Sequence, residues 1–362
     1  MDKTSAHIIE ELFYELIPAE DEAQLVIYVN GKKVVDVAGN IDPDAVTGIF
    51  SVSKALAVLA VAKLVDEGKI DLDKTVAHYW PEFAAQGKEK ITVRQLLSHQ
   101  AGLVETVKGL TIQELHSDHE AAALLAATKP AWEPGTAFGY HATTIGVLIS
   151  ELVFRVTGST VQKYYENEIR SKVNADAYLG LEKAKQNKFR QPLSATRELP
   201  LPATGSMAEK AWGNFARAMQ KSGGIDKYIF TEDRLEFGAP AFGGVASARG
   251  LAAIFNWATG YGAPEPGISK LTLKEFAATQ VKGIDIAQQN NDRHHGIVFM
   301  KPTESCPFGS PSAFGHDGAG GSIVVADPEN QTVLAYVVRR MTYPGGVDQR
   351  LFPIIEKMQE VF

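Results

Sequence analysis

The chain begins with a pattern of apolar and polar positions typical of a β-hairpin. Residues Gln24–Val29 and Lys32–Ala38 are rich in β-branched and other strand-forming side chains. The dipeptide Asn30-Gly31 stands between them, and it is a strong signal for a two-residue hairpin turn. We therefore predict two antiparallel strands close to the N-terminus.

The C-terminal part of the chain shows the same pattern. Gly321–Ala326 and Thr332–Arg339 are strand-like, and residues 327–330 between them are turn-forming. Because a lone hairpin is only marginally stable in water, we expect the strands of both chain ends to share one antiparallel sheet. Val347–Val361 is predicted to form a closing amphipathic helix.

Several helices are predicted from apolar spacing. The run Ala55–Ala62 is apolar on nearly all sides, which indicates a buried helix, and Gly68 is expected to end it. Ile8–Phe13 is amphipathic, and Ile145–Val153 is a second apolar helix.

The fold class expected from this order of elements is α/β of the α+β type. Residues 1–69 and 243–362 would form an antiparallel sheet flanked by helices, and residues 70–242 an inserted, mainly helical domain. We expect the ligand pocket in the cleft between the two domains.

Composition narrows the possible functions. The net charge of −7 over 362 residues is spread without a basic block, so we expect no nucleic-acid partner. Cys306 is the only cysteine, which excludes an intramolecular disulfide and a cysteine metal cage. There is no run of about 18 apolar residues and no secretory signal, so we expect a cytoplasmic protein without a membrane partner.

The candidate nucleophile is Ser51 in the tetrapeptide Ser51-Val52-Ser53-Lys54, which precedes the buried helix. Residues three apart share a helix face, so the Lys54 amine would reach the Ser51 hydroxyl. A serine hydroxyl needs such a neighbour to take its proton. On the tetrapeptide alone, a helix cap at Ser51 with an outward-pointing Lys54 explains the pattern equally well.

Two further segments could complete a catalytic site. A loop set by Pro134 and Gly135 delivers Tyr140 to the start of an apolar helix, where a lysine cation would favour its phenolate form as a base. The segment from His316 to Ser322 is rich in glycine and precedes a strand, so its backbone could offer an oxyanion donor together with the Ser51 N–H. Taken singly, Tyr140 could simply anchor the start of its helix, and the glycine-rich segment also fits an ordinary turn.

Together these motifs resemble the serine β-lactamase and penicillin-binding-protein superfamily, with its Ser-x-x-Lys, Tyr-x-Asn and Lys-Thr-Gly boxes in that order. The chain is most similar to the class C-like branch that contains the family VIII carboxylesterases. The segment 91–103 and the segment 243–249 resemble that branch as well. The resemblance, from about residue 20 to the end, implies a β-lactamase/transpeptidase-like fold.

The resemblance also implies roles for individual residues. Ser51 would be the nucleophile, Lys54 its proton partner and Tyr140 the general base that later passes a proton to the leaving group. Gly318 lies in the third box, and the N–H of Ala319 would join that of Ser51 in the oxyanion hole. His99 lies in a fingerprint segment of the branch, and we interpret it as structural.

Two departures from the family pattern bear on the substrate. Ala142 stands where lactamases and peptidases carry the Asn that binds a substrate amide, and a methyl group makes no hydrogen bond. His316 stands where they carry a lysine that receives the substrate carboxylate, and a histidine is mostly neutral at pH 7. The expected function is a serine carboxylesterase that hydrolyses small, uncharged or short-chain esters through an acyl-serine, without a cofactor.

Alternatives with the same residues are an acyltransferase, an amide or lactam hydrolase and a weak β-lactamase. A non-catalytic scaffold with a vestigial site belongs to another class, and the intact Ser51, Lys54 and Tyr140 weigh against it. The pair His116 and His119 has no partner ligands at metal spacing, so we expect no metal there. His294 and His295 are interpreted as residues at a strand edge.

Overall fold

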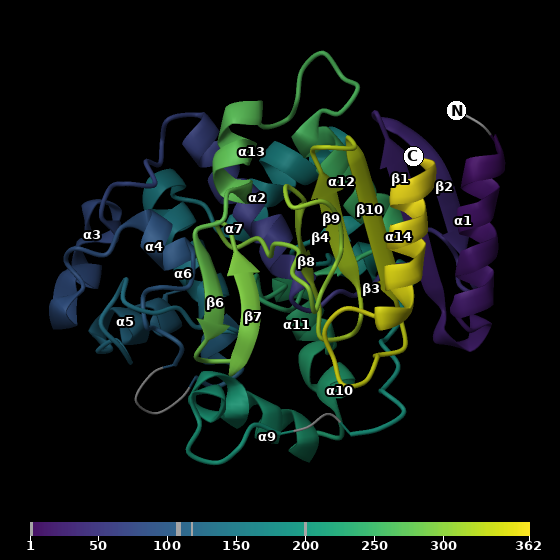
Figure 1. The fold of residues 1–362 in the computed structure, drawn as a ribbon. Coiled ribbons are helices and arrows are strands. Elements are labelled where there is room, and N and C mark those ends of the chain that lie inside the picture. The colour runs from purple at the N-terminus through teal and green to yellow at the C-terminus, as the bar shows by residue number, and fades with distance from the viewer. Residues whose placement is uncertain (1–2, 106–109, 117–118, 199–200) are drawn as a thin grey trace.

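A five-stranded antiparallel sheet forms the centre of the protein (Figure 1). The computed structural model describes residues 3–105, 110–116, 119–198 and 201–362. In spatial order the strands are β2 (Lys32–Ala38), β1 (Ala23–Val29), β10 (Thr332–Val338), β9 (Ile323–Asp327) and β8 (Phe314–Asp317). The prediction that both chain ends share one antiparallel sheet is confirmed.

The register of the sheet joins residues more than 300 positions apart. β1 pairs with β10 from Ala23 opposite Val338 to Val29 opposite Thr332. In the β1–β2 turn, Asn30 and Gly31 have φ of 48° and 74°, the left-handed conformations that a two-residue hairpin requires. The hairpin predicted at Asn30-Gly31 is confirmed.

The closing helix begins later than expected. α14 spans Phe352–Val361, whereas the sequence pattern predicted a start at Val347. The N–H of Val347 donates to the Asp317 carboxylate at 3.1 Å, and the N–H of Asp348 donates to the carbonyl of Gly321 at 3.1 Å. The turn after β8 therefore holds this backbone in place of a first helical turn.

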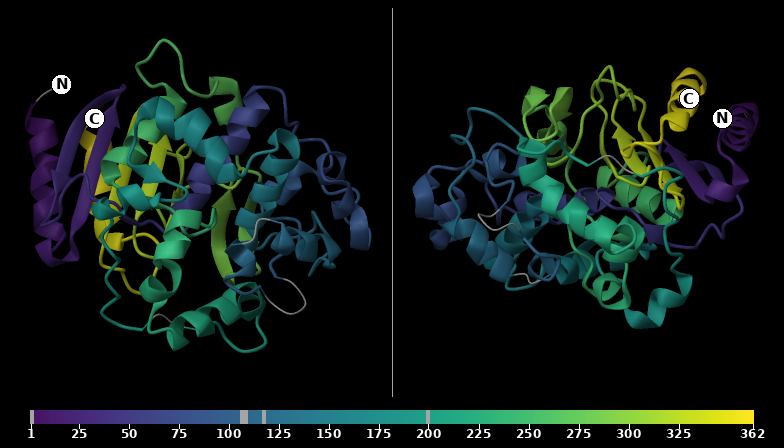
Figure 2. Two further views of the ribbon diagram at one scale, coloured as in Figure 1. Left: turned by 180° about the vertical axis from the view of Figure 1, so that it is seen from behind. Right: turned by 90° about the horizontal axis from the view of Figure 1, so that it is seen from below.

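Helices cover both faces of the sheet. α1 (Lys3–Leu16) packs beside α14 on one face, and α2 (Val52–Asp66) and α12 (Ala248–Thr259) share the core on the other (Figure 2). α2 is buried along almost its whole length, which confirms the buried helix predicted from Ala55–Ala62, and Gly68 follows it with φ of 69°. Burial of this helix between the sheet and the remaining helices fixes where Ser51 lies.

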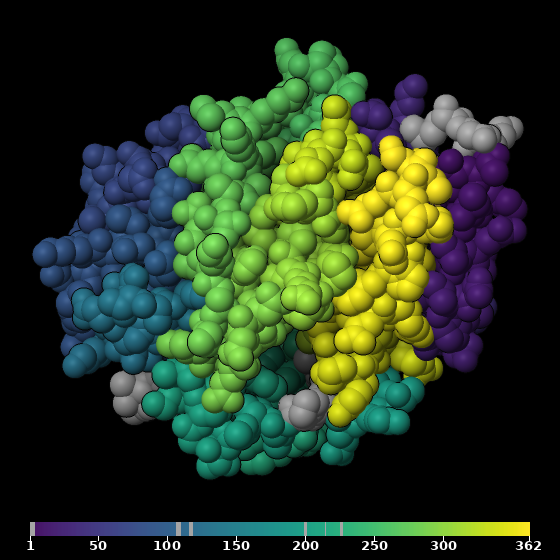
Figure 3. Space-filling model, viewed as in Figure 1, coloured from purple at the N-terminus to yellow at the C-terminus, as the bar shows by residue number. Residues whose placement is uncertain are grey.

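Among the remaining elements only α6 is long, and the others are short. The helices are α3 (Val76–Tyr79), α4 (Val93–Leu97), α5 (Glu120–Ala127), α6 (Thr144–Thr157), α7 (Val161–Tyr165), α8 (Ser171–Val173), α9 (Asn214–Lys221), α10 (Ile225–Ile229), α11 (Glu232–Phe237) and α13 (Lys270–Ala277). The strands are β3 (Thr47–Gly48), β5 (Val245–Ala246) and β4 (Ala177–Tyr178) in a small sheet, and β6 (Val281–Asp285) with β7 (Asn290–His295) in a hairpin. Figure 3 shows this hairpin, in green, between the N-terminal half of the middle segment and the C-terminal part of the chain.

The middle segment, residues 70–242, is helical and rich in loops. Its treatment as a separate domain stays a prediction. In the described part of the chain, no single helix has both the length and the apolar composition to cross a membrane. Thr144–Thr157 and Val161–Val173, which are bent by 70° from each other, meet these criteria only as a pair.

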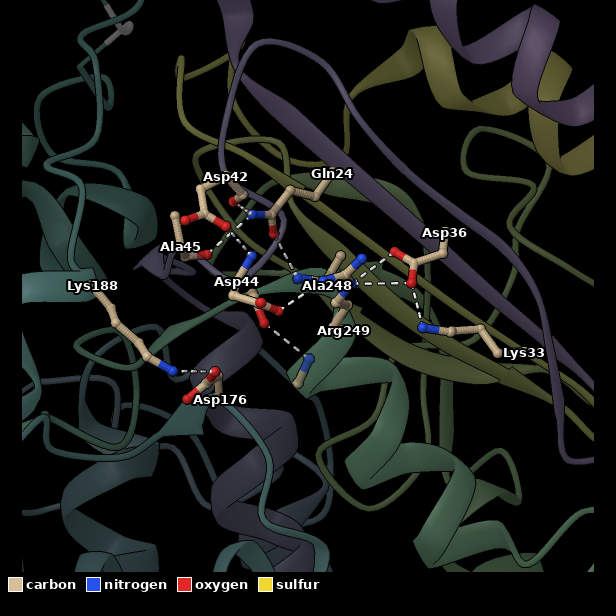
Figure 4. Close-up of polar contacts among 12 residues, drawn as sticks. Gln24, Lys33, Asp36, Asp42, Asp44, Ala45, Asp176, Lys188, Ala248 and Arg249 are labelled. Atoms are coloured by element: carbon tan, nitrogen blue, oxygen red, sulfur yellow. Dashed lines mark hydrogen bonds and ion pairs between the residues drawn. The ribbon is translucent and has the colours of Figure 1, made fainter.

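A polar network fastens the start of α12 and the loop before β3 to the sheet (Figure 4). The side-chain amide of Gln24 donates to carbonyl oxygens of Asp42 and Ala45 at 2.8 and 3.1 Å and accepts from the N–H of Ala248 at 2.8 Å. Next to it, the Arg249 guanidinium pairs with the carboxylates of Asp36 and Asp44. Because Gln24 is buried, these hydrogen bonds are shielded from water and stabilise the chain entry toward Ser51.

Candidate active site

Ser51 lies on a sharp turn that leads from β3 into α2. The preceding residue, Phe50, has φ of 48°, a left-handed conformation that is rare for a bulky side chain and often marks a functional turn. Two hydrogen bonds hold the turn: the Ser53 hydroxyl donates to the carbonyl of Phe50 and accepts from the N–H of Gly244 at 2.8 Å. The half-buried Ser51 is thereby presented at the start of a rigid, buried helix.

Lys54 is completely buried one turn further along α2. Its Nζ lies 3.0 Å from Ser51 Oγ and donates to the carbonyl of Ala241 at 2.6 Å. Burial lowers the pKa of Lys54 to about 7, and the carboxylate of Asp317 acts weakly in the opposite direction. Close to half of the Lys54 side chains are therefore uncharged at pH 7 and can accept a proton.

Tyr140 comes from a loop more than 80 residues away and reaches the same point. The Lys54 Nζ lies 5.0 Å from the centre of its ring, and the Ser51 hydroxyl is close enough to lower its pKa by hydrogen bonding. The Asp285 carboxylate holds the loop, because both of its oxygens accept from the N–H of Tyr140 at 3.1 Å. The three residues proposed from the sequence thus lie together, and Asp285 supports them.

The expected pKa shift of Tyr140 is wrong in direction. Burial raises the pKa of Tyr140 above its usual value, and this effect exceeds that of the Ser51 hydroxyl. A phenolate would lose its hydration in this buried position. Lys54 is charged in only about half of the molecules at pH 7, so its attraction for a phenolate does not compensate for that loss. At neutral pH the site therefore contains a neutral phenol, and the Lys54 amine is the stronger base.

Buried histidines surround the Tyr140 ring. The ring centres of His99, His295 and His316 lie 5.2, 6.1 and 6.0 Å from that of Tyr140. Burial lowers the pKa values of all three well below that of an ordinary histidine, in His295 to about 3. Neutral imidazoles therefore enclose the phenol and keep water away from it.

The roles predicted for these histidines from the sequence agree with the structure in some cases and not in others. His99 is fully buried and accepts from the N–H of His141, as expected for a structural residue. His294 and His295 lie at the end of β7 as predicted, but the interpretation as simple edge residues is wrong for His295, which is buried against Tyr140. The alternation of side chains along β7 turns His295 inward.

His316 is buried and uncharged. Its Nδ1 lies 2.7 Å from the carbonyl of Asp317, and a carbonyl only accepts, so Nδ1 carries the proton. The buried Nε2 is then an acceptor and has no partner among the described residues. Burial and the nearby Lys54 lower the pKa of His316, so this position supplies no permanent cation.

The turn between β8 and β9 packs directly on the segment before Ser51. A side chain added at Gly318 would place its first carbon 2.4 Å from the carbonyl oxygen of Ile49, and one at Gly320 would clash with the Phe50 ring. Only glycine permits this close approach. The N–H groups of Ser51 and Ala319 bond to no acceptor in the described part of the chain, and both remain available to a substrate.

Two further residues lie near Tyr140: Ala142, with an apolar side chain, and Arg293, with a charged one. Ala142 is half-buried, its N–H donates to the carbonyl of Tyr140 at 2.9 Å, and its methyl group offers no hydrogen bond. Burial raises the pKa values of both Tyr140 and Asp317, and the charge of Arg293 on β7 partly opposes this rise, which places its guanidinium near both groups. Its Nε is buried without a partner among the described residues.

No metal centre is found in the residues described. Within them, no group of three or more histidine, cysteine or carboxylate side chains could hold an ion. The Nδ1 of His119 lies 2.9 Å from a carboxylate oxygen of the buried Glu151, and residues 117–118 of the same motif lie outside the described residues.

Four contributors to the site were not predicted from the sequence: Asp285, His295, Arg293 and the carbonyl of Ala241. The first three lie on or beside the β6–β7 hairpin, about 145 residues from Tyr140. No local motif marks them, because only the tertiary fold brings the hairpin to the Tyr140 loop. A backbone carbonyl such as that of Ala241 has no sequence signal at all.

Comparisons with known proteins agree with this arrangement. The Beta-lactamase family matches residues 17–355 of the chain. The protein named Esterase/beta-lactamase LipL, from Mycobacterium tuberculosis, is 31% identical over 337 residues, which cover 88% of this chain and 77% of LipL.

Solved structures show the same fold over the full length. EstA from Arthrobacter nitroguajacolicus Rue61a is 39% identical with a TM-score of 0.89, covering 99% of this chain and 95% of EstA. A family VIII carboxylesterase is 27% identical with a TM-score of 0.85, covering 99% of this chain and 98% of that one. The chain therefore belongs to the β-lactamase family, with the β-lactamase-like fold, and is a serine hydrolase.

Proposed function

We propose that this protein is a carboxylesterase that hydrolyses small or short-chain carboxylic esters through an acyl intermediate on Ser51. The observation that carries the proposal is the contact of 3.0 Å between Ser51 Oγ and the Lys54 amine, together with the lowered pKa of that amine. A serine next to an amine that is partly uncharged at neutral pH is an activated nucleophile. The similarity to LipL and EstA is consistent with an ester substrate.

In the acylation step, the neutral Lys54 amine takes the proton of the Ser51 hydroxyl. Oγ then forms a bond to the ester carbonyl carbon, and the carbonyl oxygen becomes an oxyanion. The N–H groups of Ser51 and Ala319, which bond to no acceptor among the described residues, would stabilise that oxyanion. As the tetrahedral intermediate collapses, the alkoxide leaves and receives a proton from the Tyr140 phenol, which is replenished from the Lys54 ammonium.

Deacylation repeats the same steps with water. Lys54 accepts a proton from the attacking water, the water oxygen bonds to the acyl carbon, and Ser51 Oγ leaves with a proton returned through Tyr140. Burial raises the pKa of Tyr140 and keeps the proton on the phenol between these transfers. Each turnover consumes one ester and one water and releases an acid and an alcohol.

The chemistry near Tyr140 favours esters over amides. Ala142 cannot bind a substrate amide, and the neutral His316 does not replace the lysine ammonium of the family pattern. An alkoxide also departs more readily than an amine, so the absence of an amide-binding side chain is less costly for an ester.

The test is hydrolysis of a panel of esters that vary in acyl and alcohol length. We expect turnover to be highest for short acyl chains, and Ser51→Ala to lower it by at least about 10²–10⁴-fold. Ser171→Ala, at an exposed serine on α8, is the matched control and should retain wild-type activity. Near-normal hydrolysis by a folded Ser51→Ala variant would rule out the assignment.

A β-lactam substrate and an acyl acceptor other than water are the alternatives with the same residues. LipL carries both activities in its name, so nitrocefin belongs in the panel. We expect nitrocefin turnover to be at least about tenfold slower than ester turnover, because Ala142 and His316 lack the side chains that would hold an anionic amide. Product analysis with added alcohol separates hydrolysis from acyl transfer.

A further inference from the structure

A cavity lies away from the proposed catalytic residues. Its volume is about 590 Å³, in the usual range for sites that hold small organic molecules. Its walls come from the end of α12, the following loop, α13, the segment before β8 and the β9–β10 turn, near the top of the view in Figure 1. None of Ser51, Lys54, Tyr140 and His316 lines it.

One wall of the cavity is apolar. Leu273 and Ala277 of α13 face it together with Phe314 at the start of β8, and Pro311 and Pro328 complete the wall. Leu273, Ala277 and Phe314 are otherwise buried, so they are held in place by the core. This wall suits a hydrocarbon chain or a ring.

Lys301 brings a cation into the same cavity. Its side chain is only 5% exposed, and its Nζ donates to the carbonyl of Ser312 at 2.9 Å. An ammonium has three donors, and Ser312 is the sole partner among the described residues. Burial lowers the pKa of Lys301 to about 8, so the amine is still mostly protonated at pH 7 and has donors to spare.

The nearest carboxylates do not neutralise Lys301. Asp327 and Glu329 both raise its pKa, but neither forms an ion pair with it in the described structure. Asp327 is occupied elsewhere, because its oxygens accept from the N–H and hydroxyl of Ser310 at 2.8 and 2.6 Å. Glu329 is exposed at the surface.

Two more lysines stand at the rim. Lys270 and Lys274 lie one turn apart on α13, both are exposed, and neither forms an ion pair with a described residue. The protein as a whole is acidic, with a net charge of −7. Three ammonium groups around one apolar cavity, none in an ion pair with a described residue, are therefore a local feature that favours an anion.

We propose that this cavity binds a small organic carboxylate with an apolar body. The carboxylate accepts hydrogen bonds from the Lys301 ammonium, and the body lies against Leu273 and Phe314. An inorganic anion would leave the apolar wall uncovered, and an uncharged hydrocarbon would leave the Lys301 donors unsatisfied.

Isothermal titration calorimetry of the full chain with octanoate tests the proposal. We expect saturable binding of octanoate, at least tenfold tighter than that of 1-octanol or inorganic phosphate. Lys301→Met keeps the length of the side chain and removes the charge, and it should weaken octanoate binding at least tenfold. Lys129→Met, at an exposed lysine that does not line the cavity, should leave binding unchanged.

A second variant covers the case in which Lys301→Met does not fold. Leu273→Trp fills the cavity from its apolar side and should also abolish the saturable binding, while circular dichroism and thermal unfolding show that the protein is folded. Octanoate binding that both variants retain would place the ligand elsewhere and overturn the proposal, as would the absence of any binding at millimolar octanoate. Because the readout is binding, the result is independent of whether Ser51 is the nucleophile.

Discussion

The ionisation of Lys54 makes the pH dependence of catalysis a sharp prediction. An ordinary lysine has a pKa of 10.5, so only about one side chain in 3,000 is neutral at pH 7. Burial lowers the pKa of Lys54 to about 7, which makes about half of the side chains neutral. The structure thus increases the population of the competent base by roughly 10³-fold at pH 7.

The expected profile follows from this value. For the wild type, kcat/KM should rise about tenfold per pH unit below pH 7 and level off above it, because only neutral Lys54 accepts the Ser51 proton. Asp317→Asn removes the carboxylate that raises the pKa of Lys54, so the rising limb should move to lower pH. Lys54→Arg supplies a guanidinium that stays protonated and should lower kcat/KM by at least about 10³-fold.

The assay is hydrolysis of a short aliphatic ester, with the released acid measured by chromatography between pH 5 and pH 9. Asp233→Asn, at an exposed carboxylate on α11, is the matched control and should keep the wild-type profile. A wild-type profile that is flat across pH 7, or that rises only near pH 10, would show that Lys54 is not the base. A limb that moves to higher pH in Asp317→Asn would contradict the electrostatic account.

Four further substitutions test the supporting contacts. Tyr140→Phe should lower kcat by about 10²–10⁴-fold without changing the circular dichroism spectrum. A rise in KM with kcat unchanged would instead indicate a role in substrate binding. Gly318→Ala forces a carbon against the Ile49 carbonyl, so we expect a loss of activity larger than the loss of thermal stability, measured on the same sample. Asp285→Ala leaves the buried Tyr140 N–H unpaired and should cost about 1–3 kcal/mol in urea unfolding along with turnover; unchanged turnover would show that the loop needs no such anchor. Lys54→Met should raise the unfolding temperature more at pH 6 than at pH 10. The folded-state pKa lies below the unfolded value, so the buried charge destabilises the protein below pH 7, by up to about 5 kcal/mol, and this cost disappears as the pH rises toward 10.5. An equal rise in unfolding temperature at pH 6 and pH 10 would contradict the assignment of this cost to the buried charge of Lys54.

Much of the fold could be predicted because its signals are local. Asn30 and Gly31 specify a two-residue turn, and the apolar run after Ser51 specifies a buried helix, whatever the rest of the chain does. The start of α14 was misplaced because Val347 and Asp348 are held by hydrogen bonds to the turn after β8. A helical pattern in sequence cannot reveal such a competing tertiary contact.

The contacts of the site also divide into those that follow from local sequence and those that depend on the tertiary fold. Ser51 and Lys54 are three residues apart, so their contact follows from helix geometry. The contact of Tyr140 with Asp285 depends on a loop and a hairpin that meet only in the folded protein. The pKa of Tyr140 was misjudged because the sequence shows a nearby lysine but does not show burial, and burial dominates.

The central claim is that the acyl group is transferred to the hydroxyl of Ser51. Rapid acid quench during turnover of a slowly deacylated ester, followed by mass spectrometry of the intact protein and its peptides, measures this transfer directly. We expect the protein to gain the mass of one acyl group, located on the peptide that contains Ser51, and this adduct to be absent in Ser51→Ala. Acylation of a different residue, or full turnover with no adduct at any quench time, would contradict the mechanism.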